Sequence, residues 1–376
     1  MNFNKIKLKD TIISANTGAD AIQRAPIVDY DTGKKCLRIG DISNHREYNE
    51  WGFTNVNDEN YKKYKLEKDD ILIARTGSTI GINKFIDRDL EAVYNNGLIR
   101  LRVNKEKYNS KYIYYNLQTS EFRNFIDSIA FGTTGQPNMK INDLLTFKIV
   151  DLSLETQNKL VDIIDKLDKK IELNNQINNN LYELGDLLYK EYYLRFISDL
   201  PEGYGTKFLS EVAQNFDSKR KPISSREREL HHGKYPYYGA TSIIDYVDDY
   251  IFDDTYVLMG EDGTVKTEKG NPVLQYIWGK NWINNHAHVL KGIKISTEHL
   301  YFALRNVNVE SLITGAVQQK LSQENMNKIK IIIGNDKINS GFEKISGSIM
   351  QKSKLLIEEN KTLGQLRNVL LPKLRC

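Results

Sequence analysis

The sequence predicts an α+β protein in which two similar β-rich globular domains alternate with two long helices. Three observations support this prediction: the chain repeats itself at about half its length, each copy contains short strand patterns, and each copy ends in a long helical pattern. Neither helix can bury its apolar seam alone, so we expect the two to pack as an antiparallel coiled coil. The domains would then lie at opposite ends of the helices, related by a pseudo-two-fold axis.

The repeat rests on five pairs of similar segments that occur in the same order in both halves. The pairs are Tyr94–Asn96 with Ile283–Asn285, Tyr112–Tyr115 with His299–Phe302, Gly135–Ile141 with Gly315–Leu321, Phe147–Val150 with Ile329–Ile332, and Leu184–Leu187 with Leu363–Leu366. Each pair alone is weak, but the common order and the slowly changing separation argue against chance. We therefore predict a duplicated unit.

Apolar residues recur at spacings of three and four in the last part of each copy, which is typical of a helix with one apolar seam. They are Leu160, Ile164, Leu167, Ile171, Leu181 and Leu188 in the first copy, and Phe342, Ile345, Ile349, Leu356, Leu363, Leu366 and Leu370 in the second. Helix breakers are absent from about 155–196 and 342–371, apart from single glycines. Pro372 then ends the second run.

Four residues in these helical patterns invite a structural interpretation. Asn174 and Asn178 interrupt the first seam, and polar residues at seam positions usually fix the register of a coiled coil. Gly185 and Gly364 mark either a close crossing of the two backbones or a plain irregularity of the helix.

The predicted domain boundaries follow from these patterns. We expect the first globular domain at 1–150, the first spacer helix at 151–198, the second globular domain at 199–335 and the second spacer helix at 336–376. Strand patterns stand at 69–75, 98–103 and 256–259, and amphipathic helices near 110–128 and 297–313.

Composition excludes several classes of protein. Two cysteines, Cys36 and Cys376, are too few for a disulfide framework or a cysteine zinc site, which favours the reducing cytoplasm. No apolar stretch is long enough to span a membrane, and the N-terminus has no pattern of a secretory signal. The net charge of +4 is not that of a non-specific nucleic-acid coat, so any nucleic-acid contact requires clustered basic residues.

Such clusters occur in both halves, and tyrosines are interleaved with them in the second half. The candidates in the first half are Arg24, Lys34, Lys35, Arg38, Arg75, Thr76, Ser78 and Lys84. Those in the second half are Lys219, Arg220, Lys221, Arg226, Lys234, Tyr235, Tyr237, Tyr238 and Lys266. These residue types are suited to contacts with phosphates and base edges, although basic loops also occur as ordinary solvated surface.

The order of elements resembles that of the specificity subunits of type I restriction–modification enzymes over essentially the whole chain. The segments that carry the resemblance are Lys5–Asp10, Leu37–Ile42, Asp69–Gly81, Gly135–Asn138, Leu154–Gln157, Phe208–Val212 and Pro236–Ala240. The second half departs from the pattern: Ala316-Val317-Gln318 stands where the first half has Gln136-Pro137-Asn138, and Gly334–Lys337 replaces the Leu-Glu-x-Gln start of the helix.

The resemblance implies a function for each part. Each globular domain would be a target recognition domain that reads one half of a bipartite double-stranded DNA site. The helices would set the gap and dock two methyltransferase subunits. The chain itself would bind no cofactor; S-adenosylmethionine for adenine-N6 methylation, and ATP and Mg²⁺ for the restriction/translocase subunits, would belong to its partners.

We find no motif for catalysis or metal binding in the sequence. Asn271-Pro272-Val273-Leu274 lacks the second proline and the aromatic residue of an adenine methyltransferase motif, and there is no phosphate-binding Gly-x4-Gly-Lys-Ser/Thr loop. His286 and His288 share a face of a predicted strand but lack a third ligand nearby. We therefore expect a non-catalytic protein without a metal. The alternative is a coiled-coil scaffold whose two globular domains bind protein or carbohydrate.

Overall fold

The computed structural model describes residues 4–130, 138–315 and 318–373, so parts of the matched segments 135–141 and 315–321 lie outside the described residues. The chain divides into two compact units. The first contains Met1–Glu172 and Asn360–Cys376, and the second contains Leu173–Glu359. Both divisions fall within a long helix, so each unit contains a part of each long helix.

The first unit holds three antiparallel or mixed sheets. They are β1 (Lys5–Lys7) with β10 (Lys148–Val150); β2 (Ile12–Thr17), β9 (Leu98–Val103), β6 (Ile71–Ala74) and β7 (Asn83–Phe85); and β3 (Ile27–Val28), β5 (Phe53–Thr54), β4 (Lys35–Leu37) and β8 (Ala92–Tyr94), each in spatial order. Its shorter α-helices are α1 (Ile39–Ser43), α2 (Asp58–Tyr64), α3 (Ser110–Asn116), α4 (Ser120–Ala130) and α5 (Ile141–Leu144). One apolar core lies around the second of these sheets, and a separate core lies around the third.

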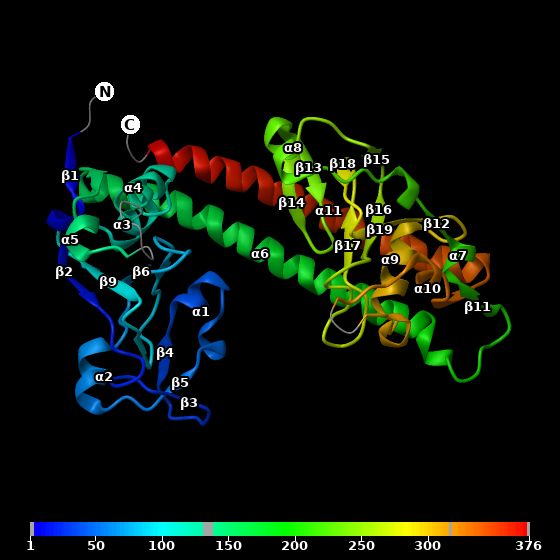
Figure 1. Ribbon diagram of the computed structural model, residues 1–376, viewed down its shortest axis with the longest axis horizontal. Coiled ribbons are helices and arrows are strands. Elements are labelled where there is room, and N and C mark those ends of the chain that lie inside the picture. The colour runs from blue at the N-terminus through cyan, green and yellow to red at the C-terminus, as the bar shows by residue number, and fades with distance from the viewer. Residues whose placement is uncertain (1–3, 131–137, 316–317, 374–376) are drawn as a thin grey trace. The chain divides into compact units, whose positions relative to one another are not determined.

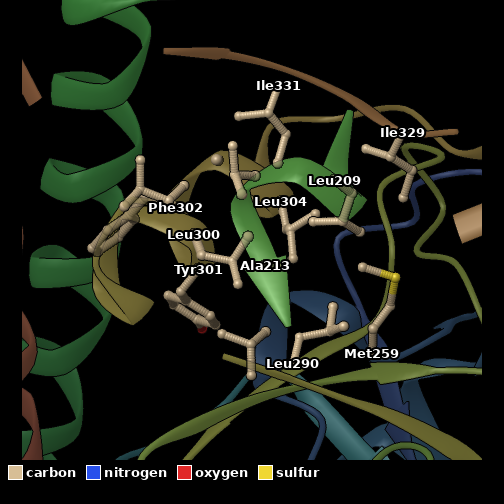
Figure 2. Packing of buried hydrophobic residues seen from close by; sticks show 14 of the residues in the cluster. Leu209, Ala213, Met259, Leu290, Leu300, Tyr301, Phe302, Leu304, Ile329 and Ile331 are labelled. Atoms are coloured by element: carbon tan, nitrogen blue, oxygen red, sulfur yellow. The ribbon is translucent and has the colours of Figure 1, made fainter. Parts of the chain in front are cut away.

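The second unit is built in the same way. Its sheets are β11 (Tyr204–Phe208) with β20 (Lys330–Gly334); β12 (Ala213–Asn215), β19 (Ala287–Gly292), β16 (Tyr256–Gly260) and β17 (Leu274–Ile277); and β14 (Ile243–Val247), β13 (His232–Tyr238), β18 (Lys280–Ile283) and β15 (Phe252–Asp253). Its shorter α-helices are α7 (Leu209–Val212), α8 (Ser225–Leu230), α9 (Thr297–Arg305) and α10 (Gln323–Asn327). Figure 2 shows the main core, in which side chains of α7, α9 and the sheets interdigitate.

The strand order confirms the predicted duplication. In each unit, the strand at its start pairs with the strand just before the long helix, as β1–β10 and β11–β20. The sheet β2-β9-β6-β7 has its counterpart in β12-β19-β16-β17, and each third sheet contains one parallel pair, β4–β8 or β13–β18. Even an isolated bridge recurs, since Thr76 pairs with Asn138 and Asp262 with Lys320.

The short helices differ from the prediction in two respects. The amphipathic pattern near 110–128 forms two helices, α3 and α4, because Leu117–Thr119 leaves the helical path and the hydroxyl of Thr119 accepts a hydrogen bond from the Phe122 amide at 3.3 Å. In the second unit, α9 ends at Arg305 and only a 3₁₀ turn, Glu310–Leu312, follows it.

The two predicted long helices are present as α6 (Leu154–Tyr192) and α11 (Asp336–Lys373), shown in green and in orange to red in Figure 1. Within the second unit they run antiparallel. Asn174 donates to Glu359 at 2.8 Å, Ser353 donates to Tyr182 at 2.9 Å, and Tyr193, just after α6, donates to Asn339 at 3.1 Å. Within the first unit, Arg367 of α11 donates to Asp168 of α6 at 3.0 Å.

The seam residues singled out in the sequence behave differently from one another. Asn174 and Asn178 are both buried, in agreement with their predicted seam positions. Gly185 lies against α9 and not against α11: a β-carbon there would be 2.1 Å from the Phe302 ring, which Figure 2 shows pointing toward α6. Nothing lies within 4 Å of a β-carbon built on Gly364, so the structure shows no backbone crossing at these glycines.

The start of α11 lacks the glutamine that α6 has, but an asparagine makes the corresponding hydrogen bonds. Gln157 of α6 is buried, accepts from the Asn109 amide at 2.8 Å and donates to the Leu152 carbonyl at 2.8 Å. Asn339 of α11 is also buried, accepts from the Gly334 amide at 2.9 Å and donates to the Gly334 carbonyl at 2.8 Å. A carboxamide on the fourth residue of each long helix therefore ties that helix to the chain just before it.

Candidate nucleic-acid interface

The candidates around β4 divide into a surface group and a buried group. Lys34 is partly exposed, forms an ion pair with Asp58 at 3.0 Å and lies over the Tyr61 ring. The Arg38 side chain is 35% exposed and lies 3.8 Å from Asp41 at the start of α1. Lys35 is only 9% exposed, and its ammonium group donates to the carbonyls of Asn49 and Trp51 at 2.8 and 2.9 Å. Lys34 and Arg38 can therefore meet a polyanion, whereas Lys35 holds the domain together.

A glycine-rich turn follows β6 and carries three further candidates. Gly77 and Gly81 both have positive φ, which allows the chain to reverse tightly before β7. Arg75 is partly buried and donates to Asn138 at 3.1 Å, whereas Ser78 is exposed and Thr76 lies at the bridge to Asn138. The equivalent turn after β16 carries an acid, because Glu261 pairs with Lys320 at 3.4 Å. The same position of the frame therefore carries a cation in the first unit and, in the second, an acid that Arg220 and Lys320 neutralise.

Lys84 stands on β7 at the side of a cleft. Its ammonium group lies 5.9 Å from the Trp51 ring centre. The cleft has a volume of about 690 Å³ and is lined from α1, β7 and α4, with Glu47 and Arg123 among its polar residues. Cations and one acid therefore share its wall.

The basic cluster at 219–221 also contains one structural residue. Lys219 and Lys221 are exposed, and Lys219 lies over the Phe216 ring. The Arg220 side chain is only 12% exposed; it donates to Glu261 and to the Ala287 carbonyl at 2.7 Å each. Arg220 therefore ties the loop to the sheet, while its two neighbours face solvent.

Arg220 lies beside the one group of possible metal ligands that the described residues contain. Asp217, Glu261 and His288 lie close together, with His288 fully buried and its Nδ1 2.6 Å from Asp217. The other ring nitrogen faces the Leu321 carbonyl at 2.7 Å. Because Arg220 lies 2.7 Å from Glu261 and 3.4 Å from Asp217, a guanidinium already supplies the positive charge that a metal would bring. We interpret the group as an ion-pair network that fixes three loops.

Strand β13 carries the interleaved tyrosines, and burial separates them. Tyr237 is 2% exposed and accepts from the Ile223 amide at 3.2 Å. Burial raises the pKa of Tyr238 to about 12. Tyr235 is partly exposed and lies 5.1 Å from the Tyr250 ring, with the exposed Lys234 over its face. Of the three tyrosines, Tyr235 is therefore the best placed to contact a ligand.

Tyr250 and Lys280 extend this surface, and sequence reasoning missed both. Lys280 is exposed, and its ammonium group lies 4.5 Å from the Tyr250 ring centre. A hydrogen bond that Lys280 donates to Tyr250 raises the pKa of Lys280 above its ordinary value. Lys280 lies near Tyr235 because β18 pairs with β13 in parallel, and Tyr250 joins them because β15 pairs with β18. No local pattern indicates either pairing.

The remaining candidates have simpler surroundings. Arg24 is exposed and donates to Tyr64 at 3.3 Å, and Arg226 is exposed on α8. Lys266 is partly buried and forms an ion pair with Glu310. Burial raises the pKa of Cys36 to about 12, so its thiol stays protonated and is not a nucleophile.

Two anchors join the globular parts to α6, one in each unit. In the first unit, Lys111 and Tyr115 of α3 reach Asp165 at 2.6 and 2.7 Å. In the second unit, Arg305 of α9 holds Asp186 through three contacts of 2.7 to 3.1 Å. Charge-assisted pairs of this kind fix orientation as well as distance.

The comparisons with known proteins identify the family. The model of the type I restriction modification DNA specificity domain matches residues 4–183 and again 201–364. The chain therefore belongs to the type I restriction–modification DNA specificity family, with two copies of its domain.

Two curated relatives come from Haemophilus influenzae. A protein assigned to the type I restriction enzyme specificity subunits is 38% identical over 141 residues, which cover 37% of this chain and 36% of that protein. The HindI specificity subunit is 28% identical over 163 residues, which cover 43% of this chain and 35% of that subunit. The matched part thus spans about a third of the length of either relative.

A solved structure matches over nearly its whole length. The crystal structure of the S subunit of a type I restriction–modification system from M. genitalium has a TM-score of 0.59 and 19% identity, and the match covers 100% of this chain and 96% of that one. This similarity confirms the fold. Among the described residues, no helix combines the length and the apolar character needed to cross a bilayer.

Proposed function

We propose that this chain is the DNA-specificity subunit of a type I restriction–modification complex, in which each globular unit reads one half of a bipartite DNA site. The observation that carries the proposal is the duplication of one frame with two different polar surfaces. One surface has Lys34, Arg38 and Arg24, and the other has Lys219, Lys221 and the Tyr235–Lys280 surface. Two domains that recognise different half-sites need such an arrangement. Contacts to base edges determine which sequence is bound, and contacts to phosphates position the protein on the DNA.

The exposed cations would supply the contacts to phosphates, and the side chains between them would contact the bases. The residues we assign to phosphates are Arg24, Lys34, Arg38, Lys84, Lys219, Lys221, Arg226, Lys234 and Lys280, and those we assign to groove contacts are Thr76, Ser78 and Tyr235. Lys35, Arg220 and Tyr237 are omitted from the interface because they are bound inside the domains.

We further propose that α6 and α11 set the gap between half-sites and dock two methyltransferase subunits. Exposed leucines on α6 support this role: Leu173, Leu184 and Leu187 are 50%, 46% and 63% exposed. On α11, Leu355 is 61% exposed. Apolar side chains in such a series on a helix are suited to burial against a partner protein.

In this assembly the chain is not itself an enzyme. The methyltransferase subunits would use S-adenosylmethionine to methylate adenine, and restriction/translocase subunits would use ATP and Mg²⁺. We retain 1–150 and 199–335 as target recognition domains and 151–198 and 336–376 as spacers, and we place the complex in the cytoplasm.

The test is a map of methylated adenines in genomic DNA from the host, with this gene intact and deleted. We expect a bipartite methylated motif with a fixed gap that disappears on deletion. Methylation without a bipartite motif, or an unchanged methylation pattern, would contradict the proposal. The second outcome would favour the alternative, a scaffold for protein or carbohydrate.

A further inference from the structure

The connection that leaves the first strand of the central sheet is built differently in the two units. In the first unit, β2 ends at Thr17 and the chain reaches β3 at Ile27 through a single compact turn. In the second unit, β12 ends at Asn215 and the chain passes through the 3₁₀ turn Asp217–Lys219 and helix α8 before β13. The equivalent place in the duplicated frame therefore carries two unrelated elements.

The turn in the first unit is held rigidly at both of its ends. A β-carbon on Gly18 would lie 2.2 Å from the Asn95 carbonyl oxygen, so only glycine fits there. Ala19 is fully buried and donates its amide to the Tyr94 carbonyl at 2.9 Å. Ala25 is also fully buried, and its amide donates to the carbonyl of Asp20 at 2.8 Å.

Asp20 closes the turn from inside. Its carboxylate accepts hydrogen bonds from the amides of Ile22 at 2.7 Å and Gln23 at 2.9 Å. The amides of Gln23 and Ile22 hold the pKa of Asp20 below its ordinary value, so the carboxylate stays charged at neutral pH. The backbone of the turn is thus preorganised.

The fixed backbone presents three consecutive side chains to solvent. Ile22 is 86% exposed, the most exposed of the large hydrophobic residues described, and Gln23 and Arg24 are exposed beside it. An apolar side chain on a rigid, projecting turn gains nothing for the stability of the fold, whereas all three residue types are useful for reading a base edge.

Cations surround this turn. Arg24 donates to Tyr64 of α2 at 3.3 Å, and Lys63 lies over the same ring at 5.3 Å. Lys62 and Lys63 are exposed in the last turn of α2. Arg24 and Lys63 thus share one ring beside the projecting turn, and Lys62 precedes Lys63 on the same helix. Positive charges grouped in this way match the phosphates that flank a groove.

We propose that the turn Asp20–Arg24 is the base-reading element of the first unit, with Gln23 and Ile22 at base edges and Arg24, Lys62 and Lys63 at phosphates. A glutamine can bond adenine through two atoms in the major groove, and an aliphatic side chain can contact the thymine methyl group. The rigid backbone limits the entropy lost when these side chains meet DNA. This inference rests on the proposed function.

The second unit supports the assignment, because α8 occupies the equivalent connection and is also rigidly capped. Ser224 and Glu227 form a capping box at its start, with hydrogen bonds of 3.3 and 2.8 Å. Arg226 is exposed on this helix, and Leu230 at its end is 79% exposed. An exposed cation and an exposed aliphatic residue recur together, as in the first unit.

The experiment uses the full chain co-expressed with the methyltransferase subunits of the same restriction–modification system, in a host that lacks adenine methylation. Methylated sites are mapped for the wild type and for Gln23→Ala, Ile22→Ala and Gln214→Ala. Gln214 is the matched control, because it is an exposed glutamine on strand β12 of the other unit. We expect Gln23→Ala to relax one base pair of one half-site by about 10- to 100-fold in methylation preference, and to leave the other half-site and the gap unchanged.

Four outcomes are informative in different ways. A relaxed base in one half-site for Gln23→Ala or Ile22→Ala, with Gln214→Ala unchanged, supports the inference. A normal motif for both turn variants overturns it but leaves the proposed function intact. Loss of complex assembly without any change of motif would overturn it too, because the turn would then contact protein. A wild type without a bipartite motif would contradict the proposed function itself.

Discussion

Gly185 and Gly364 occupy matching places in the sequence of the two copies, yet their surroundings differ. Gly185 faces the fully buried ring of Phe302, where a β-carbon would lie 2.1 Å from the nearest ring carbon. Gly364 faces open space. Packing against Phe302 therefore requires a glycine at position 185 of α6. At position 364 of α11 no packing requires a glycine, and it only lowers the stability of the helix.

This difference predicts opposite effects of the same substitution. Gly185→Ala should lower the free energy of unfolding by about 1–3 kcal/mol, because the Phe302 ring is packed on all sides and cannot move away. Gly364→Ala should raise it by up to about 1 kcal/mol, because alanine favours the helix. Urea denaturation of the full chain measures both; equal shifts in the same direction would contradict the packing assignment.

Basic residues show the same dependence on surroundings. Lys35 and Arg220 belong to basic runs that look alike in sequence, but both are bound by backbone carbonyls inside their domains. Those carbonyls come from distant segments, so residue type and spacing did not indicate the burial. The sequence predicted where the basic residues cluster, and only the fold separates the exposed members from the structural ones.

At the scale of elements, local patterns predicted the parts that local physics controls. The strand pattern at 98–103 is β9, and that at 69–75 contains β6, because alternating or continuous apolar residues identify buried strands. The two long helices followed from their seams. The break between α3 and α4 was missed because a threonine cap is inconspicuous within an amphipathic pattern, and the Tyr235–Lys280 surface was missed because parallel strand pairing joins it.

The loop before α8 provides a prediction at this scale. Replacing both Lys219 and Lys221 with alanine should weaken DNA binding by the assembled complex and reduce the slope of log affinity against log salt by about 2. The slope falls because fewer counterions are released from the DNA when each phosphate contact is lost. The measurement is a salt titration of binding to the mapped site. An unchanged slope would remove this loop from the interface.

Arg220→Ala is the internal control for that prediction. It removes a side chain that is only 12% exposed and leaves Glu261 and Asp217 without their guanidinium partner. We expect it to lower the stability of the second unit by about 3 kcal/mol. Thermal unfolding should therefore distinguish Arg220→Ala from the double lysine variant, which should unfold like the wild type.

At the scale of the whole molecule, the long helices are proposed to act as a ruler. Inserting four residues into both α6 and α11, at 172/173 and 359/360, should add about one helical turn to each, or about 6 Å at 1.5 Å per residue. We expect the gap of the methylated motif to grow by about two base pairs, while both half-sites stay the same. Mapping of methylated adenines measures the length of the gap. An unchanged gap would show that the length of the helices does not set it.

The pairing of β1 with β10 and of β11 with β20 has a consequence for how such a gene can change. In each unit the first strand of the globular part pairs with its last strand, so that Lys5 lies opposite Val150 and Tyr204 lies opposite Gly334. The segment between these strands can therefore be exchanged for another of different length without moving its two ends. Recombination within the short shared frame would give viable hybrids, and the two halves could acquire new specificities independently of each other.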